Sequence, residues 1–229
     1  MFVVEKDPKS IAAETYKVLR TNIQYSSYDG DLKVLVVTSA QPQEGKSITS
    51  GNLALSLAQD DKKVILVDCD LRRPSVHKKF FLSNTVGVTE VVLGRKSLES
   101  AIQKYNPTLD ILPSGKVPPN PSEMLGSENM QNLINELKEM YDYVILDTPP
   151  ILAVTDAQVL STKADGVVFV VKSGATKKDD ILQAKSQLEK VKAPIVGAVL
   201  NKVEKSDKNQ YYYYYGDDEK RVSRNRRKK

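Results

Sequence analysis

The sequence predicts an α/β fold in which a mostly parallel β-sheet is covered by helices on both faces. Short, almost continuous apolar runs rich in β-branched residues recur along the chain, and longer segments with helical spacing separate them. No run reaches the roughly 18 uninterrupted apolar residues that a membrane-spanning helix needs. The 229 residues, of which 40% are hydrophobic and 28% charged, fit one sizeable domain.

The elements can be predicted in chain order. A helix is expected over residues 10–26, where apolar residues recur at Ile11, Tyr16, Leu19 and Ile23, and a turn is expected over 26–30. Buried strands are predicted over residues 33–39, 64–68, 109–112, 143–147, 166–172 and 194–200, of which 109–112 is the weakest. Helices are predicted over residues 45–60, 127–140, 155–162 and 177–191, and Pro118–Pro121 indicates a surface loop.

The end of the chain differs in composition from the rest. Periodicity disappears near Glu204, so we expect one domain over residues 1–203 and a flexible tail over residues 204–229. The net charge of +5 depends on this tail, because its last ten residues carry seven positive charges and no acid. The preceding part is slightly acidic, and we therefore expect no nucleic-acid partner.

Two features concern the cellular compartment. The N-terminus lacks the basic and apolar regions of a secretory signal, and the single cysteine, Cys69, allows no internal disulfide. A cytoplasmic location is therefore expected. Cys69 lies between two acids, which disfavours a reactive thiolate, and His77 is the only histidine, so neither is given a chemical role.

The segment after the first strand is the strongest indication of chemistry. Residues 40–47 read Ala-Gln-Pro-Gln-Glu-Gly-Lys-Ser, which is the P-loop pattern with alanine in place of the first glycine. In a P-loop, backbone N–H groups surround the β-phosphate, the lysine reaches the β- and γ-oxygens, and the serine hydroxyl ligates Mg²⁺. The sequence therefore predicts a P-loop NTPase that binds ATP and Mg²⁺; an ordinary turn with an exposed lysine is the alternative. The expected nucleotide-binding residues are Gln41, Pro42, Gln43, Glu44, Gly45, Lys46, Ser47 and Ile48.

Carboxylates follow two other predicted strands. Asp68 and Asp70 come at the end of one strand, and Asp147 ends another. Because the carboxyl ends of parallel strands meet at one edge of a sheet, these acids are expected to converge on the P-loop. Asp147 then resembles a Walker B acid, which holds Mg²⁺ directly or through water. Taken singly, each acid could also be a helix N-cap or a loop charge.

These motifs together resemble the bacterial tyrosine kinases. The resemblance rests on the P-loop, on Asp68-x-Asp70-x-Arg72, on Ile-Leu-Asp-Thr-Pro-Pro at residues 145–150, and on five consecutive tyrosines at 211–215. It extends over essentially the whole chain and is greatest to the separate kinase subunits of capsular and exopolysaccharide synthesis in Gram-positive bacteria. It implies an ATP-dependent tyrosine kinase that phosphorylates its own tail, at Tyr211, Tyr212, Tyr213, Tyr214 and Tyr215.

The resemblance also implies roles for individual residues. Asp68 would act as the base toward the tyrosine hydroxyl, and Lys46 would neutralise charge on the transferring phosphoryl group. Ser47, Asp70 and Asp147 would organise Mg²⁺. Asn201, at the end of the last predicted strand, falls where related ATPases contact adenine.

The partners are implied in the same way. They are a transmembrane activator, the polysaccharide co-polymerase subunit, which would recruit the chain to the inner face of the plasma membrane; a cognate tyrosine phosphatase; and further copies of the chain in a ring. The helix over residues 10–26 would serve this assembly. The basic residues after Glu219 could contact anionic lipids or only keep the tail soluble.

The chain departs from the family pattern at two places. Gln43 replaces a family glycine; if that position requires a positive φ, the cost is about 1 kcal/mol, and otherwise the loop differs in shape. Glu14, Lys17 and Arg20 stand where the family has Glu-x-x-Arg-x-x-Arg for ring assembly, and lysine lacks the bidentate fork of arginine. A solvated helix face is the alternative interpretation of these three residues.

Other functions were weighed against the kinase. The chief rival is a P-loop switch ATPase of the partition or septum-positioning type, but those proteins have a lysine where this chain has Gln41. A GTPase is disfavoured by Glu204, which stands where guanine recognition usually has aspartate. A binding module without phosphotransfer is a further alternative. The tyrosine run favours the kinase, although it could also be an interaction patch or low-complexity sequence.

Overall fold

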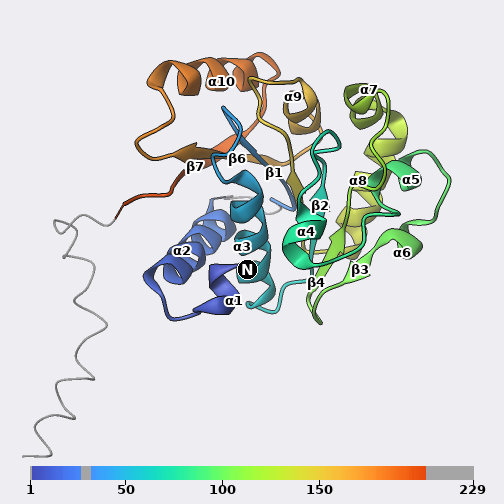
Figure 1. Cartoon of the computed structure of the whole chain (residues 1–229), viewed down its shortest axis with the longest axis horizontal. Helices are drawn as coiled ribbons and strands as arrows, with labels where there is room; N and C mark the ends of the chain where they lie inside the picture. The colour runs from blue at the N-terminus through green and yellow to red at the C-terminus, as the bar shows by residue number, and fades with distance from the viewer. Residues whose placement is uncertain (1, 27–31, 205–229) are drawn as a thin grey trace, which may run out of the picture.

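A computed structural model describes residues 2–26 and 32–204 of the chain (Figure 1). The turn predicted after Ser26 and the tail from residue 205 onward, including the five tyrosines, lie outside the described residues. Within residues 2–26 and 32–204, none of the helices offers the length and apolar character that a bilayer-spanning segment requires.

The centre of the molecule is a seven-stranded sheet with the order β3-β4-β2-β5-β1-β6-β7. All neighbouring strands are parallel except β3 and β4, which pair antiparallel. The strands are β1 (Val34–Ser39), β2 (Val64–Asp68), β3 (Gln103–Lys104), β4 (Leu109–Leu112), β5 (Tyr143–Asp147), β6 (Gly166–Lys172) and β7 (Ile195–Asn201). β1 lies between β5 and β6, so the segment that follows β1 leaves the middle of the sheet.

Helices cover both faces of this sheet, as the sequence predicts (Figure 1). One face is covered by α1 (Val3–Lys6), α2 (Ile11–Tyr25), α3 (Lys46–Ala58) and α4 (Val76–Phe80). The other is covered by α5 (Val88–Val92), α6 (Leu98–Ala101), α7 (Pro121–Gly126), α8 (Glu128–Met140), α9 (Asp156–Ser161) and α10 (Lys178–Lys190).

A hydrophobic core lies on each face of the sheet, and successive residues of a strand pack alternately into one core and the other. In β1, Val34 and Val36 pack into the core under α5–α10, whereas Leu35 and Val37 pack into the core under α1–α4. All four side chains are fully buried, which is why residues 34–37 are apolar at consecutive rather than alternate positions. The same double burial explains the apolar runs of β2 and β5.

The longer predicted elements are confirmed, and the short ones show where the sequence analysis failed. Helices α1, α4, α5, α6 and α7 were not predicted, since four to six residues are too few to show a clear helical periodicity, and strand β3, which was also not predicted, has only two residues. Pro121 does not belong to a surface loop but is the buried first residue of α7, a position that proline favours. Strand β7 is not a buried strand as predicted: it is the sheet edge, with Ile195 37% and Leu200 60% exposed.

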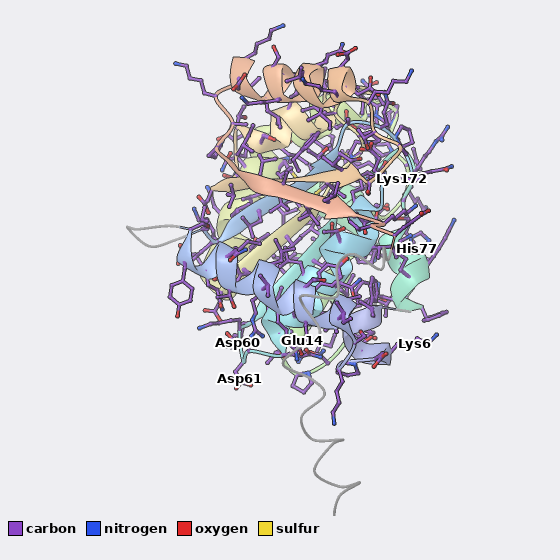
Figure 2. All side chains as sticks on the ribbon, turned by 90° about the vertical axis from the view of Figure 1, so that its left-hand side faces the viewer. Lys6, Glu14, Asp60, Asp61, His77 and Lys172 are labelled. Atoms are coloured by element: carbon purple, nitrogen blue, oxygen red, sulfur yellow. The ribbon has the colours of Figure 1, made fainter. Side chains whose placement is uncertain are left out.

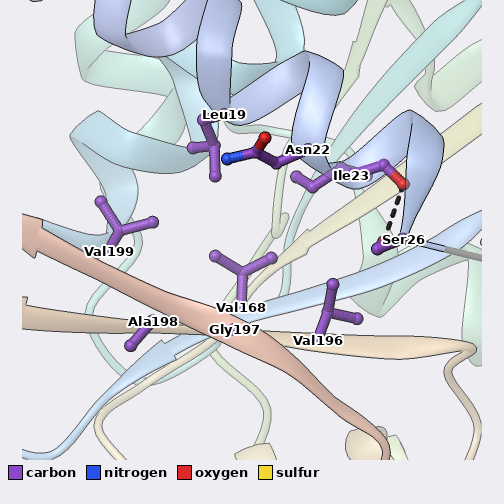
Figure 3. A pocket seen from close by; sticks show the side chains of 9 residues that line it. All are labelled: Leu19, Asn22, Ile23, Ser26, Val168, Val196, Gly197, Ala198 and Val199. Carbon is purple, nitrogen blue, oxygen red and sulfur yellow. Dashed lines mark hydrogen bonds between the residues drawn. The ribbon is translucent and has the colours of Figure 1, made fainter.

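A pocket of about 220 Å³ lies between α2 and strands β6 and β7 (Figure 3). Leu19 and Ile23 approach it from the helix, and Val168 and Val199 approach it from the sheet. The described residues that line it are uncharged, so they offer no cation to the phosphates of a nucleotide. The nucleotide chemistry must therefore be sought elsewhere, at the carboxyl ends of the strands.

Candidate active site

The turn between β1 and α3 has the backbone shape of a phosphate-binding loop. Gln43 and Gly45 both have positive φ, 63° and 100° respectively. The positive φ at Gln43 decides between the alternatives left open by the sequence: the backbone there adopts the left-handed conformation that favours glycine. At Gly45 glycine is required for a second reason, because a Cβ there would lie 2.0 Å from Nδ2 of Asn201.

Glu44 stabilises this loop with its side chain. The side chain is 3% exposed, and Oε2 accepts a hydrogen bond from the backbone N–H of Gln41 at 3.0 Å. Its other oxygen accepts a hydrogen bond from the hydroxyl of Thr176, beyond the end of β6. The carbonyl of Glu44 accepts a hydrogen bond from Nδ2 of Asn201 at 2.9 Å. The sequence predicts that Glu44 and Asn201 lie beside the nucleotide. In the structure these two residues connect the loop to the segment after β6 and to the end of β7.

Lys46, at the start of α3, lies against Asp70. Nζ of Lys46 is 3.3 Å from Oδ2 of Asp70, and the two side chains are 14% and 8% exposed. Ser47 follows Lys46, and its hydroxyl accepts a hydrogen bond from Ser75 Oγ at 3.2 Å. The lysine and the serine predicted to act on the phosphates therefore lie beside the Asp-x-Asp segment.

Asp68 is enclosed by the segment that follows it. It is fully buried, and Oδ2 accepts hydrogen bonds from the backbone N–H groups of Ser75 and Val76, both at 3.0 Å. Oδ1 accepts a weaker bond from the N–H of Asp70 at 3.3 Å. Burial and the nearby charge of Asp147 raise the pKa of Asp68 to about 8. Asp68 thus has the proton affinity of a general base that operates near neutral pH.

Asp147 is the direct neighbour of Asp68 across the sheet, since the two residues pair in register between β2 and β5. Oδ1 of Asp147 accepts a hydrogen bond from Ser50 Oγ at 3.0 Å. Oδ2 is buried and has no hydrogen-bond partner within the described part of the chain. Burial raises the pKa of Asp147, and the positive charge of Lys46 offsets part of this rise.

The unpartnered oxygen of Asp147 suits a cation ligand, because a buried carboxylate oxygen without a partner is costly. No three His, Cys, Asp or Glu side chains of the described residues gather closely enough to hold a metal by themselves. This agrees with Mg²⁺, which usually takes one or two carboxylates and completes its shell with water and phosphate oxygens. Ser47, Asp70 and Asp147 therefore fit a magnesium–nucleotide complex.

Arg72, the last residue of Asp-x-Asp-x-Arg, connects this segment with two helices of the other face. Its guanidinium forms a bidentate pair with Asp156, with Nε–Oδ2 at 2.9 Å and Nη2–Oδ1 at 3.1 Å. Nη2 also donates to Ser122 Oγ at 2.9 Å, and the hydroxyl of Ser122 donates to Asp156. Asp156 is fully buried, whereas the Arg72 side chain is 38% exposed.

Several predicted residues lie outside this site. Glu14 and Lys17 form an exposed ion pair on α2, with 2.6 Å between Oε1 and Nζ. Arg20 does not extend into solvent but donates from Nη1 to the carbonyl of Ser56 at 2.9 Å. Figure 2 labels Glu14 on the side of the molecule that α2 covers. The chain thus uses Arg20 to attach α2 to α3, and only the first two residues of the triplet remain on the surface.

Other residues of the site were not found from the sequence. Ser50 contacts Asp147, and Ser75 contacts Ser47. Thr176 supports the P-loop through Glu44, and Asp156 supports Arg72. Ser50 lies one helical turn after Ser47, a spacing that could have identified it. The other three contacts join segments distant in sequence, and no local pattern signals them. Burial and the neighbouring acids raise the pKa of the Cys69 thiol well above its usual value, in agreement with its expected lack of reactivity.

Comparison with known proteins agrees with this geometry. Residues 32–198 match the family described as AAA domain. The chain is 49% identical over 206 residues to tyrosine-protein kinase YwqD of Bacillus subtilis, a match that covers 90% of this chain and 87% of that protein. It is 40% identical to tyrosine-protein kinase CpsD of Streptococcus agalactiae, over 84% of both chains. The chain belongs to the bacterial tyrosine kinase family.

Solved structures agree with this assignment. The chimerical protein CapA2B2 superimposes with a TM-score of 0.85 at 37% identity, covering 89% of this chain and 90% of that one. The septum site-determining protein MinD of Pyrococcus horikoshii, solved with Mg-ADP, superimposes with a TM-score of 0.65 at 23% identity. At that identity the likeness to MinD extends to the fold alone. The P-loop NTPase fold is thus common to both groups, and the closer sequence relationship is to the kinases.

Proposed function

We propose that this bacterial tyrosine kinase transfers the γ-phosphoryl group of ATP to tyrosines 211–215 of its own tail and thereby regulates capsular or exopolysaccharide synthesis. It comprises a kinase domain over residues 1–203 and an acceptor tail over residues 204–229. The observation that carries the proposal is the convergence of the P-loop with three carboxylates, Asp68, Asp70 and Asp147, at the ends of two adjacent strands.

ATP is held by the turn before α3. The N–H groups of residues 43–47, at the turn and the start of α3, surround the phosphates, and the positive end of the helix favours their charge. When ATP binds, the Lys46 ammonium leaves Asp70 and pairs with the β- and γ-phosphate oxygens, which carry more negative charge than one carboxylate. Asn201 lies over Gly45, at the side where the base is expected, and its contact with the loop supports a role beside the adenine.

Magnesium is held by Ser47, Asp70 and Asp147. These residues would hold the cation beside the phosphates, where it would supply positive charge to offset the negative charge that develops during transfer. Once Lys46 turns to the phosphates, Asp70 is available to the cation. Ser50 and Ser75 hold Asp147 and Ser47 in place, so they act as positioning residues.

Asp68 receives the proton of the acceptor. The phenolic oxygen attacks the γ-phosphorus, the bond to the bridging oxygen of ADP breaks, and the phenolic proton passes to the Asp68 carboxylate. ADP leaves with the bonding electron pair. Because Ser75 and Val76 enclose Asp68, we expect the segment over residues 73–76 to move aside when a tyrosine enters.

The partners follow from the family. We propose a transmembrane activator that brings the cytoplasmic chain to the inner face of the plasma membrane, a cognate phosphatase and a ring of several copies. The exposed pair Glu14–Lys17 would contribute to the ring, and the basic end of the tail would contact anionic lipids. A switch ATPase is less favoured, because Gln41 occupies the position of its signature lysine.

Intact-mass spectrometry after incubation with ATP, Mg²⁺ and the cytoplasmic segment of the activator tests the proposal. The unmodified chain should gain successive increments of about 80 Da, one for each phosphate, on residues 211–215. Lys46→Met should abolish them, because the phosphates lose their cation. Lys63→Met, at an exposed lysine directly before β2, is the matched control and should not change the increments. ATP hydrolysis without any phosphotyrosine would support the switch ATPase instead.

A further inference from the structure

The segment that encloses Asp68 carries a concentration of positive charge. Between Leu71 and Phe81 the chain has four arginines and lysines and no acid. Arg72 is paired with Asp156. The other three, Arg73, Lys78 and Lys79, are called the basic rim. Arg73 and Lys78 are exposed and Lys79 is half-buried, and none of them forms an ion pair with any residue that the structure describes.

The basic rim is attached to the carboxylates of the active site. The N–H of Arg73 donates to Oδ1 of Asp70 at 3.0 Å, and the N–H of Val76 donates to Asp68. Lys78 and Lys79 lie on α4, which begins at Val76. In Figure 2, His77 of this helix lies on the same side of the molecule as Lys172, at the end of β6. The rim therefore adjoins the place where an acceptor tyrosine must enter.

The positive charges of the rim affect the pKa of its neighbour His77. Burial, and next the charges of Lys78 and Lys79, lower the pKa of the imidazole. The positive charge of the rim therefore comes from Lys78, Lys79 and Arg73. A ligand of the rim should carry several negative charges close together.

The acceptor segment of this chain has that property. Asp217, Asp218 and Glu219 are consecutive acids, and only Gly216 separates them from the tyrosine run. We propose that the basic rim binds the acidic run Asp217–Glu219 of the tail, in the same or a second copy, and so presents the nearest tyrosines to Asp68 first. This inference rests on the proposed autokinase function and specifies how its substrate is recognised.

An order of phosphorylation follows from this recognition. Tyr215 and Tyr214 lie closest to the acidic run and should react before Tyr211 and Tyr212. Each new phosphate adds about 1.5 to 2 negative charges, which extends the acidic run toward the N-terminal end of the cluster. The rim can then hold the newly charged residues, and modification proceeds from Tyr215 toward Tyr211.

Charge reversal on each side, alone and combined, tests the proposal in the full chain with ATP, Mg²⁺ and the cytoplasmic segment of the activator. The rim is reversed by Lys78→Glu with Lys79→Glu, and the tail by Asp217→Lys, Asp218→Lys and Glu219→Lys. Site-resolved mass spectrometry follows the initial rate at each tyrosine. Either reversal should slow Tyr215 about tenfold and abolish the order, and the combined variant should recover most of the rate. The effect should shrink as salt is raised, since the charges are exposed.

A matched control is Lys62→Glu with Lys63→Glu, which reverses one exposed and one half-buried lysine directly before β2, at the opposite ends of the strands. It should leave the order and rates unchanged, and thermal unfolding checks that all variants fold. Unchanged order after rim reversal, or no recovery in the combined variant, would overturn this inference and leave the kinase intact. Absence of phosphotyrosine in the unmodified chain would overturn the kinase function and, with it, the inference.

Discussion

Gln43 and Gly45 give the phosphate-binding turn its shape. Both residues lie in the left-handed region, where a Cβ crowds the backbone and glycine is favoured. A side chain at Gly45 would be strained at φ 100° and would also displace the side chain of Asn201. Gln43 is exposed and can be replaced, so the backbone strain at this position is accessible to a direct measurement.

Gln43→Gly should raise the free energy of unfolding by about 0.5 kcal/mol, because the relief of left-handed strain exceeds the extra entropy that glycine gains on unfolding. Urea unfolding without nucleotide measures it. Gln131→Gly, inside helix α8, provides the comparison and should lose about 1 kcal/mol. Equal losses in the two variants would mean that residue 43 is not strained.

At the scale of elements, single side chains connect the layers around the site. Arg72 joins the end of β2 to α7 and α9 through Ser122 and Asp156. Glu44 joins the P-loop to the segment after β6 through Thr176. These links fix the P-loop and the Asp-x-Asp segment relative to both helical layers, so the geometry of the site depends on elements that contact no phosphate.

The two members of the Arg72–Asp156 pair should differ in their effect on stability. Arg72→Ala leaves a fully buried carboxylate without its cation and should cost about 3 kcal/mol. Asp156→Ala leaves an arginine that can turn toward water and should cost only about 1 to 2 kcal/mol. Chemical denaturation of both variants, with the double variant completing the cycle, measures this. Equal costs would contradict the assigned burial.

At the scale of the whole molecule, the parallel sheet gathers the functional groups at one edge. The last strand, β7, ends at Asn201 on that edge, so the tail leaves the domain beside the P-loop. From Asn201 to Tyr213 an extended chain spans roughly 40 Å, enough to reach the site of a neighbouring copy. The slightly acidic body and the phosphorylated tail should repel each other in such an assembly.

Phosphorylation of the tail should therefore dissociate the assembly. Light scattering should give a mass of several chains before incubation with ATP and a lower mass afterwards, because five phosphates add roughly 7 to 10 negative charges. Replacement of tyrosines 211–215 by phenylalanine is the control, and that variant should keep its mass. A phosphorylated chain with unchanged mass would contradict the repulsion, and a single-chain mass in both states would contradict the assembly.

The sequence by itself determined the α/β class, the main strands and longer helices, and the phosphate-binding turn. The strands β1, β2 and β5 are recognisable because both faces are buried, which gives each of them a run of consecutive apolar residues. The P-loop is recognisable because its chemistry lies in consecutive residues. The convergence of Asp68 and Asp147 also followed from the sequence, because parallel strands place their ends together.

Only the tertiary structure decided which contacts these residues make. Arg72 and Asp156 are 84 positions apart, and Glu44 and Thr176 are 132 apart. Nothing in the local sequence reports the enclosure of Asp68, the attachment of Arg20 to α3, or the exposure of β7 at the sheet edge. Local sequence patterns indicate whether a residue is buried and which backbone conformation it adopts. Which distant residues pair depends instead on how whole helices and strands pack against one another.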